Sequence, residues 1–387
     1  MSIPLDRLYN FVDSLCGGDI IIYRFSPHGS KKITDLTSIK SLRSYQDSAV
    51  CMICHDQEPL NYDYYSDPDR LQEIIKIQSA NCVLNLSSGD RRERIGSLLL
   101  KKNLKMIDIK LFSQHYVFLL HSEKNSQDLA IYEQSGFIGV YWWSHAMIAR
   151  DWFRFAEHDL ELKHRQIKQD FLIYNRAWSG TREYRLKFAE MIVQQDLKEH
   201  CYMKFNPQDD SRHYQNHVYR NPVFAVNTPL ENHFELNTYD ATASADYETL
   251  DYTTTGIEVV LETLFDDARC HLTEKILRPI ACGQPFMLAA TAGSLEYLRS
   301  YGFHTFAPLI DETYDTMQDP VARLAAITSE MRRIADLPAH EKQSLFDQLR
   351  EIAQHNRQWF FSPEFQHNIV QELKHNLKQG RDRLVGS

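Results

Sequence analysis

A cluster of arginines follows one strand-like run, and its spacing suits the recognition of a diphosphate. The apolar run 171–174 (FLIY) leads into a polar turn, and a helix is predicted over 182–193 with Thr181 as its N-cap. The basic and amide side chains of this turn are Asn175, Arg176, Arg182 and Arg185. Backbone N–H groups at a helix N-terminus favour an anion, and guanidinium groups bind phosphate oxygens in pairs. The pattern predicts a diphosphate clamp, with a solvated basic turn as the alternative.

A second group of polar residues follows the predicted strand 258–261. Thr273 is a suitable N-cap for a helix that ends at Gly283. In that helix Glu274 lies in the first turn, where its carboxylate can accept two ribose hydroxyl hydrogens, and Lys275 can meet a phosphate. The alternative is that Glu274 only complements the helix dipole and Lys275 is solvated.

Acidic side chains also follow two strand-like runs of the first half. Asp56 and Glu58 come after the run 49–54, and Glu123 comes after the run 116–120. A carboxylate at the end of a parallel strand can act as a general base. A solvated turn is the alternative for each of these loops.

The elements that must position these residues alternate between strands and helices, which is the rhythm of a parallel α/β fold. A long helix is predicted from Ser144 to about residue 165, irregular loops over 206–256, and a helical C-terminal region from about 319. The strand-like runs are 19–25, 49–54, 81–86, 116–120, 171–174, 258–261 and 285–290. The predicted C-terminal helices are 320–336, 339–356 and 362–380. The tryptophans at 142 and 143 favour a core position over a stacking platform.

The length, composition and net charge of the chain limit the class of protein to which it can belong. The chain has 387 residues, of which 43% are hydrophobic and 25% charged, which is typical of a folded globular protein of about two domains. It has no apolar run of the roughly 20 residues that span a bilayer. The seven cysteines are scattered, which favours a reduced, cytoplasmic protein. The net charge of -9 means that any contact with nucleic acid needs a local basic patch. The 17 histidines show no metal-ligand spacing, so no metal is expected.

The segment that runs from Glu262 through Thr273-Glu274-Lys275 to Gly283-Gln284-Pro285-Phe286 resembles the donor-binding region of fucosyltransferase-like glycosyltransferases of the GT-B architecture. The turn with Arg176, Arg182 and Arg185 is similar to the arginine motif that opens their second domain. The resemblance covers roughly 170–320. The stretch 23–30 (YRFSPHGS) looks more narrowly like T-even-type phage proteins that glycosylate hydroxymethylated cytosine in DNA.

The resemblance implies an α/β fold of the GT-B type, with two Rossmann-like domains facing across a cleft and with C-terminal helices. The expected parts are an acceptor-binding domain over 1–165, a nucleotide-sugar-binding domain over 166–360, and a C-terminal helix over 361–387 that packs back on the first domain.

The resemblance also implies an activity, that of a metal-independent inverting glycosyltransferase. It would move a sugar, arabinose or glucose, from a UDP-sugar to 5-hydroxymethylcytosine in double-stranded phage DNA, in the cytoplasm of the infected host cell. No cofactor is expected beyond the donor substrate. The implied donor-binding residues are Asn175, Arg176, Arg182, Glu262, Thr273, Glu274 and Lys275. The base is expected at Asp56, then Glu58, then Glu123. The expected acceptor-binding residues are His28, His55, His145 and Arg150.

Two other interpretations stay open at this stage. The same fold could glycosylate a surface polysaccharide or a lipid-linked glycan. A protein that binds nucleotides without catalysis would keep the clamp and lack the base. Fucosyltransferases show an asparagine soon after the glutamate matched to Glu262, whereas this chain has Thr263-Leu264, which favours UDP over GDP.

Overall fold

The computed structural model describes residues 20–24, 50–55, 117–134, 138–209, 211–236 and 244–385. The chain divides into two compact units. Among the described residues, unit 1 comprises those from His145 to Asn368, and unit 2 comprises the earlier ones together with those from Ile369 onwards. The C-terminal helix α14 (Pro363–Val385) contributes to both units. The predicted strand 81–86 lies outside the described residues.

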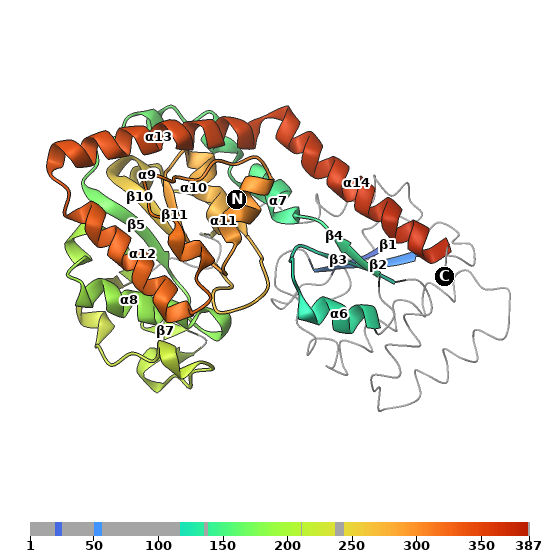
Figure 1. Cartoon of the computed structure of the whole chain (residues 1–387), viewed down its shortest axis with the longest axis horizontal. Coiled ribbons are helices and arrows are strands. Elements are labelled where there is room, and N and C mark those ends of the chain that lie inside the picture. The colour runs from blue at the N-terminus through green and yellow to red at the C-terminus, as the bar shows by residue number, and fades with distance from the viewer. Residues whose placement is uncertain are drawn as a thin grey trace. The chain divides into compact units, whose positions relative to one another are not determined.

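Unit 1 is built on a parallel sheet with the order β11-β10-β5-β6-β9, of which β11, β10 and β5 are labelled in Figure 1. Its strands are β5 (Gln169–Asn175), β6 (Cys201–Phe205), β9 (Glu235–Leu236), β10 (Thr255–Leu261) and β11 (Phe286–Ala289). Numbered by first appearance and read from β9, this is the order 3-2-1-4-5 of a doubly wound sheet. The order reverses between β5 and β10, and in such sheets ligands bind beyond the carboxyl ends of the strands at that point. The fold itself therefore points to the loops after Asn175 and Leu261.

Strand β10, which pairs with both β11 and β5, is buried over its whole length, which explains its nearly continuous apolar sequence. It begins at Thr255, three residues before the predicted start. Gly256 allows the close approach of helix α13 (Ala339–Phe361), because a Cβ atom there would lie 2.6 Å from the ring of Phe346. A larger residue would push this helix away from the sheet.

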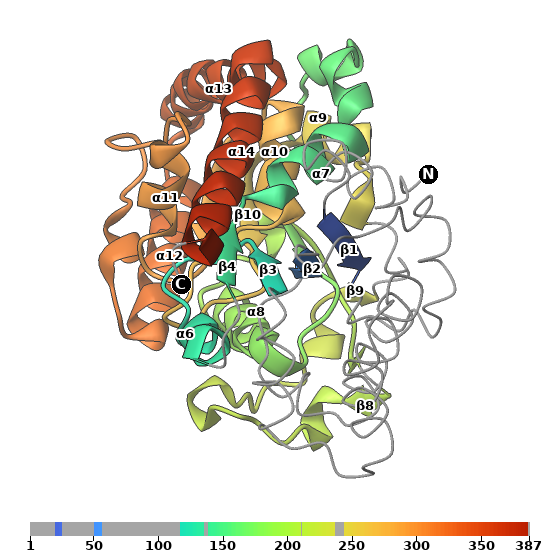
Figure 2. The same ribbon diagram turned by 90° about the vertical axis from the view of Figure 1, so that its right-hand side faces the viewer.

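Helices cover both faces of this sheet. Helix α10 (Glu274–Cys282) packs against α13, whereas α8 (Tyr184–Gln194) packs against α12 (Pro320–Ala335). Figures 1 and 2 both place α10 and α13 on one side of β10 and α8 on the other. Right-handed crossovers require this, because the chain moves from β5 to β6 in one direction and from β10 to β11 in the other.

Three helix predictions were wrong in their bounds. The helix expected from Ser144 to residue 165 ends at Trp152 as α7, and 3-10 turns follow it at Arg154–Glu157 and Glu161–Lys163. The C-terminal helical region is confirmed, with α13 and α14 each extending five residues past its predicted end.

The predicted N-cap of α8 was also wrong. Residues Gly180–Arg182 form a 3-10 turn, and α8 begins at Tyr184 after Glu183, so Thr181 does not cap it. Gly180, the first residue of this turn, has a φ of 66°, a left-handed conformation that glycine adopts readily. The described residues between β6 and β9 form short turns and the hairpin of β7 (Gln208–Asp209) and β8 (Arg212–His213), in line with the irregular region predicted over 206–256. The prediction was wrong at the end of that region, where α9 (Thr249–Thr254) forms.

Unit 2 holds a second parallel sheet whose strands lie in chain order. They are β1 (Ile20–Arg24), β2 (Val50–His55), β3 (Val117–His121) and β4 (Ile138–Tyr141). Helix α6 (Gln127–Gln134) lies against β4. The last part of α14 is bound to this unit, because Trp142 Nε1 donates to the carbonyl of Ile369 at 2.9 Å and Asn376 Nδ2 donates to that of Tyr141 at 2.7 Å.

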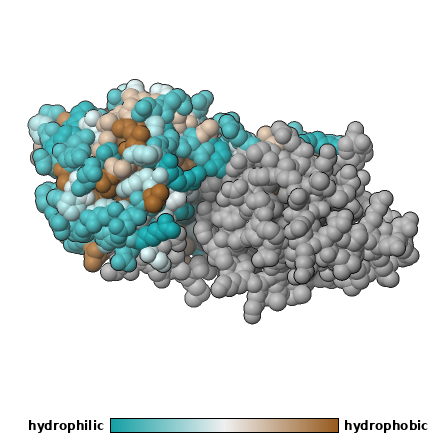
Figure 3. All heavy atoms as spheres, turned by 90° about the horizontal axis from the view of Figure 1, so that it is seen from below, coloured by the Kyte–Doolittle hydropathy of each residue, from teal (hydrophilic) through white to brown (hydrophobic). Residues whose placement is uncertain are grey.

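The chain is thus a mixed α/β protein with parallel sheets and C-terminal helices. Trp142 and Trp143 are fully buried, which confirms their predicted core position. Among the residues the structure describes, no helix has the length and apolar character needed to cross a membrane. The described surface seen in Figure 3 is mostly hydrophilic, with scattered apolar side chains.

Candidate functional site

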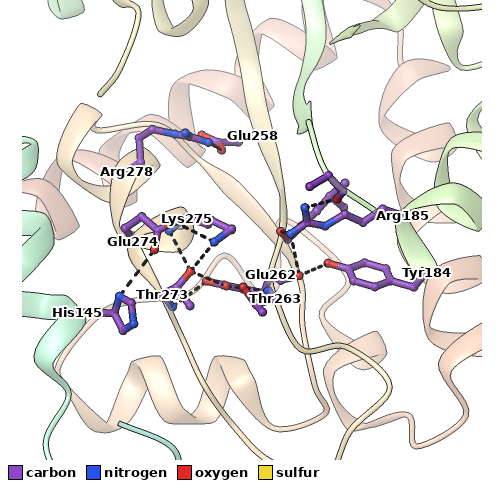
Figure 4. A network of polar contacts seen from close by, with 12 residues as sticks. His145, Tyr184, Arg185, Glu258, Glu262, Thr263, Thr273, Glu274, Lys275 and Arg278 are labelled. Carbon is purple, nitrogen blue, oxygen red and sulfur yellow. Dashed lines mark hydrogen bonds and ion pairs between the residues drawn. The ribbon is translucent and has the colours of Figure 1, made fainter. Parts of the chain in front are cut away.

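The carboxylate of Glu262 lies at the centre of the polar network at the end of β10 (Figure 4). Its oxygens accept hydrogen bonds from the backbone N–H of Thr263 at 3.1 Å, the backbone N–H of Thr273 at 3.0 Å and Thr273 Oγ1 at 2.8 Å. The side chain is fully buried, and burial raises its pKa. Glu262 therefore fixes the start of α10 to the end of β10.

Helix α10 begins as the sequence predicted. Thr273 is its N-cap, and its Oγ1 accepts a hydrogen bond from the backbone N–H of Lys275 at 3.3 Å. Gly283 ends the helix in the left-handed conformation, with a φ of 64°. The helix N-terminus therefore lies next to the carboxyl end of β10, and the helix dipole favours an anion there.

Glu274 and Lys275 form an ion pair in the first turn of this helix, with 2.8 Å between Oε1 and Nζ. Nδ1 of His145, from α7, lies 3.7 Å from the other oxygen of Glu274. Burial alone would raise the pKa of Glu274, but the charges of Lys275 and His145 outweigh it and lower the pKa to about 2. Glu274 is thus held as an anion that is 8% exposed.

The start of α8, which follows the loop after β5, is joined to the same network through Tyr184 and Arg185. Tyr184 donates its hydroxyl hydrogen to the carbonyl of Glu262 at 2.6 Å. Arg185 is buried, and it donates to the carbonyl of Leu261 at 2.6 Å and to that of Ala177 at 2.7 Å. The guanidinium of Arg185 therefore braces the two strand ends.

Arg176 and Arg182 are placed differently from Arg185, since both are half-buried. Among the described residues, Arg176 has no hydrogen bond or ion pair from its guanidinium. The charge of Arg182 acts on both Tyr184 and Arg185, where it opposes the burial that raises the pKa of Tyr184 to about 12. Two guanidinium groups thus come from the loop after β5, and one ammonium group comes from the first turn of α10.

Asn175 ends β5 and lies behind these groups. It is 1% exposed, and its Nδ2 donates to the carbonyl of Arg185 at 3.1 Å. Its Oδ1 is buried without a hydrogen-bond partner among the described residues. Asn175 therefore supports the loop that carries the arginines.

A second polar layer lies beneath the site, and the sequence analysis missed it. Glu258 on β10 forms an ion pair with Arg278 of α10 at 3.0 Å, and both contact the hydroxyl of Tyr252. The guanidinium also lies 4.0 Å from the ring centroid of Tyr174. The signal in the sequence was Glu258 itself, because an acidic residue within an apolar buried strand needs a buried partner.

The remaining predicted residues are spread over the chain. His145 lies beside Glu274 in unit 1, and Arg150 donates to the carbonyls of Phe360 and Phe361 at the end of α13. Glu123 follows β3 in unit 2 and is 2% exposed. His55 is the last residue of β2, and only its backbone is described. His28, Asp56 and Glu58 lie outside the described residues.

The described segments contain no preformed metal-binding site. No group of three or more His, Cys, Asp or Glu side chains there could hold a metal ion. The expectation of a metal-independent site stays a prediction.

The pairing of Glu274 predicts a pH effect on stability. Its folded-state pKa of about 2 lies below the usual value of 4.5, so the stabilisation is present above pH 4.5 and is lost as the pH falls towards 2. Glu274→Gln is expected to cost about 2 kcal/mol of unfolding free energy at pH 7. This difference should shrink between pH 4.5 and 2 in urea unfolding curves. Glu341→Gln, at an exposed position, is the control, and a difference for Glu274→Gln that is independent of pH would contradict the assignment.

Known proteins offer no direct guide to this chain. No protein-family model, no curated protein and no solved structure matches it. What the site binds must therefore be inferred from its geometry and from the motif resemblance.

Proposed function

We propose that the chain is an inverting glycosyltransferase that moves a sugar from a UDP-sugar to 5-hydroxymethylcytosine in DNA and that needs no metal ion. One observation carries the donor half of this proposal. Arg176 and Arg182 come from the loop after β5, Lys275 begins α10 after β10, and these are the two strands between which the order of the sheet reverses.

In the proposed reaction, the two arginines and the lysine stabilise the negative charge of the leaving diphosphate. When the sugar leaves, negative charge develops on the diphosphate of UDP, and preorganised cations and helix N–H groups stabilise that charge. Arg176, Arg182 and Lys275 supply the cations, and α10 supplies the N–H groups. Glu274, held as an anion, accepts hydrogen bonds from the ribose hydroxyls.

Glu262 has a different role in this proposal from the contact with the donor expected for it. Its two carboxylate oxygens already accept hydrogen bonds from Thr263 and Thr273, and the side chain is fully buried. It acts as a positioning residue that sets the start of α10, and Lys275 and Glu274 with it.

The transfer step also needs a base. The acceptor hydroxymethyl oxygen attacks the anomeric carbon as the bond to the diphosphate breaks, so the configuration inverts and UDP leaves. The base takes the hydroxyl proton, and we assign it to a carboxylate of the first half, with Asp56 before Glu58 and Glu123. The motif resemblance supports the DNA acceptor, and the sugar is arabinose or glucose.

The test is sugar transfer by the full chain. UDP-glucose and UDP-arabinose, each radiolabelled in the sugar, are incubated with duplex DNA that contains hydroxymethylcytosine, with unmodified DNA as the control. We expect that UDP is released and that the labelled sugar is incorporated only when the DNA contains hydroxymethylcytosine. Asp56→Asn should keep UDP affinity but lower turnover by a factor of about 100 or more, because it removes the base.

The other outcomes separate the alternatives. Transfer to a polysaccharide or lipid-linked glycan but not to DNA would favour the glycan transferase. UDP binding without turnover on any acceptor would favour a protein that binds nucleotides without catalysis. Near-normal turnover of Asp56→Asn would move the base to Glu58 or Glu123, which Glu58→Gln and Glu123→Gln then distinguish.

A further inference from the structure

The carboxylate of Asp209 is bound to the backbone of residues 176–183, the loop between β5 and α8, which we call the arginine loop. Its Oδ2 accepts hydrogen bonds from two successive backbone N–H groups, those of Trp178 at 2.8 Å and Ser179 at 2.7 Å. These groups lie between Arg176 and Arg182. An acceptor on successive N–H groups is the arrangement with which turns bind anions, and here the anion belongs to the protein.

Asp209 belongs to an insertion, residues 206–236, that runs from the end of β6 to β9. The same insertion holds the indole of Trp178, whose Nε1 donates to the carbonyl of Asn206 at 2.9 Å. Trp178 is fully buried. The middle of the arginine loop is therefore anchored by its backbone and by a side chain.

A second carboxylate fixes the end of the loop. Glu183 is 3% exposed and accepts hydrogen bonds from the backbone N–H groups of Arg220 at 2.7 Å and Asn221 at 3.1 Å. Nε2 of His217 lies 2.7 Å from the same carboxylate. The loop and the insertion thus hold each other from both sides.

We infer that Asp209 is a positioning residue for the donor-binding arginines, and that the start of the insertion, through Asp209 and Asn206, orders the arginine loop before the nucleotide binds. This rests on the proposed function. The N–H groups of Trp178 and Ser179 are occupied by Asp209, so recognition of the diphosphate falls to the side chains of Arg176 and Arg182.

The physical reason is preorganisation. A loop that is free before binding loses conformational entropy when the ligand orders it, and this loss weakens affinity. The bonds to Asp209 order the backbone between the two arginines in advance. Removal of the carboxylate should leave the arginines in the chain but lower the affinity that they provide.

The experiment compares Asp209→Ala and Asp209→Asn with the unmodified full chain. The control is Glu231→Gln, because Glu231 is a carboxylate of the same insertion that bonds to Tyr214 rather than to the arginine loop. The measurements are the Kd for UDP by calorimetry, hydrogen exchange of the 176–183 backbone, and the thermal unfolding midpoint.

We expect Asp209→Ala to weaken UDP binding about tenfold and to speed exchange in 176–183, with the unfolding midpoint little changed. Asp209→Asn should recover part of the affinity because its side-chain oxygen can still accept from both N–H groups. Glu231→Gln should stay within about twofold of the unmodified chain. In transfer assays the KM for the UDP-sugar should rise while kcat stays near its original value.

Two results would overturn the inference alone. Unchanged UDP affinity in Asp209→Ala would mean that the loop needs no such anchor. Tighter binding would mean that Asp209 competes with phosphate for the two N–H groups. A failure of the unmodified chain to bind UDP would instead overturn the proposed function together with the inference.

Discussion

Replacement of Lys275 by alanine is expected to weaken UDP binding about 10- to 100-fold, because a charge-assisted hydrogen bond to a phosphate contributes about 1.5–3 kcal/mol. The ammonium group of Lys275 lies in the first turn of α10, where the N-terminus of the helix also favours the negatively charged diphosphate. Titration of the full chain with UDP by calorimetry measures the loss. Lys275→Arg should keep most of the affinity, since it keeps the charge.

The control for this experiment is Lys187→Ala. Lys187 on α8 forms an ion pair with Glu190 at 2.7 Å, so the change removes one paired lysine from the same unit outside the proposed site. We expect its Kd for UDP to match that of the unmodified chain. Equal UDP affinity in Lys275→Ala and Lys187→Ala would rule out the clamp at α10. Arg176→Ala then asks whether the loop after β5 binds the diphosphate.

The largest stability effect is expected beneath the site. Arg278→Leu should lower the unfolding free energy of unit 1 by about 3–5 kcal/mol, because it leaves the carboxylate of Glu258 buried without its cation. Glu258 is 1% exposed and lies 3.0 Å from the guanidinium of Arg278. Chemical unfolding followed by tryptophan fluorescence measures the change.

The double variant Glu258→Leu with Arg278→Leu tests the cause. Since it removes both charges, we expect it to be more stable than Arg278→Leu alone. Asp336→Ala is the matched surface control, because the pair that Asp336 forms with Arg332 is exposed and should contribute little to stability. A double variant as unstable as the single one would show that packing, rather than the orphaned charge, causes the loss.

The start and end of α10 could be predicted from the sequence, because both depend on hydrogen bonds between residues close in the chain. Thr273 caps the helix through a group two residues away, and Gly283 adopts the left-handed conformation that glycine favours. The first turn with Glu274 and Lys275 follows directly. The start of α8 was less predictable, because Glu183, at its N-cap position, is bound by residues 217–221.

The sequence by itself determined where β1, β2, β3, β5, β10 and β11 form and where α10 begins, although it missed β4 and β6. It also determined that basic side chains follow β5 and β10. Only the tertiary structure decided what each charged side chain does. Arg185 holds two strand ends together, while the guanidinium of Arg176 makes no polar contact with the described residues, although the two arginines are only nine residues apart. Glu262 bonds to Thr273 and Asp209 bonds to Trp178, partners 11 and 31 residues away. The physical reason is distance along the chain: local propensity acts over a few residues, whereas these bonds exist only after the sheet has brought remote loops to the same edge.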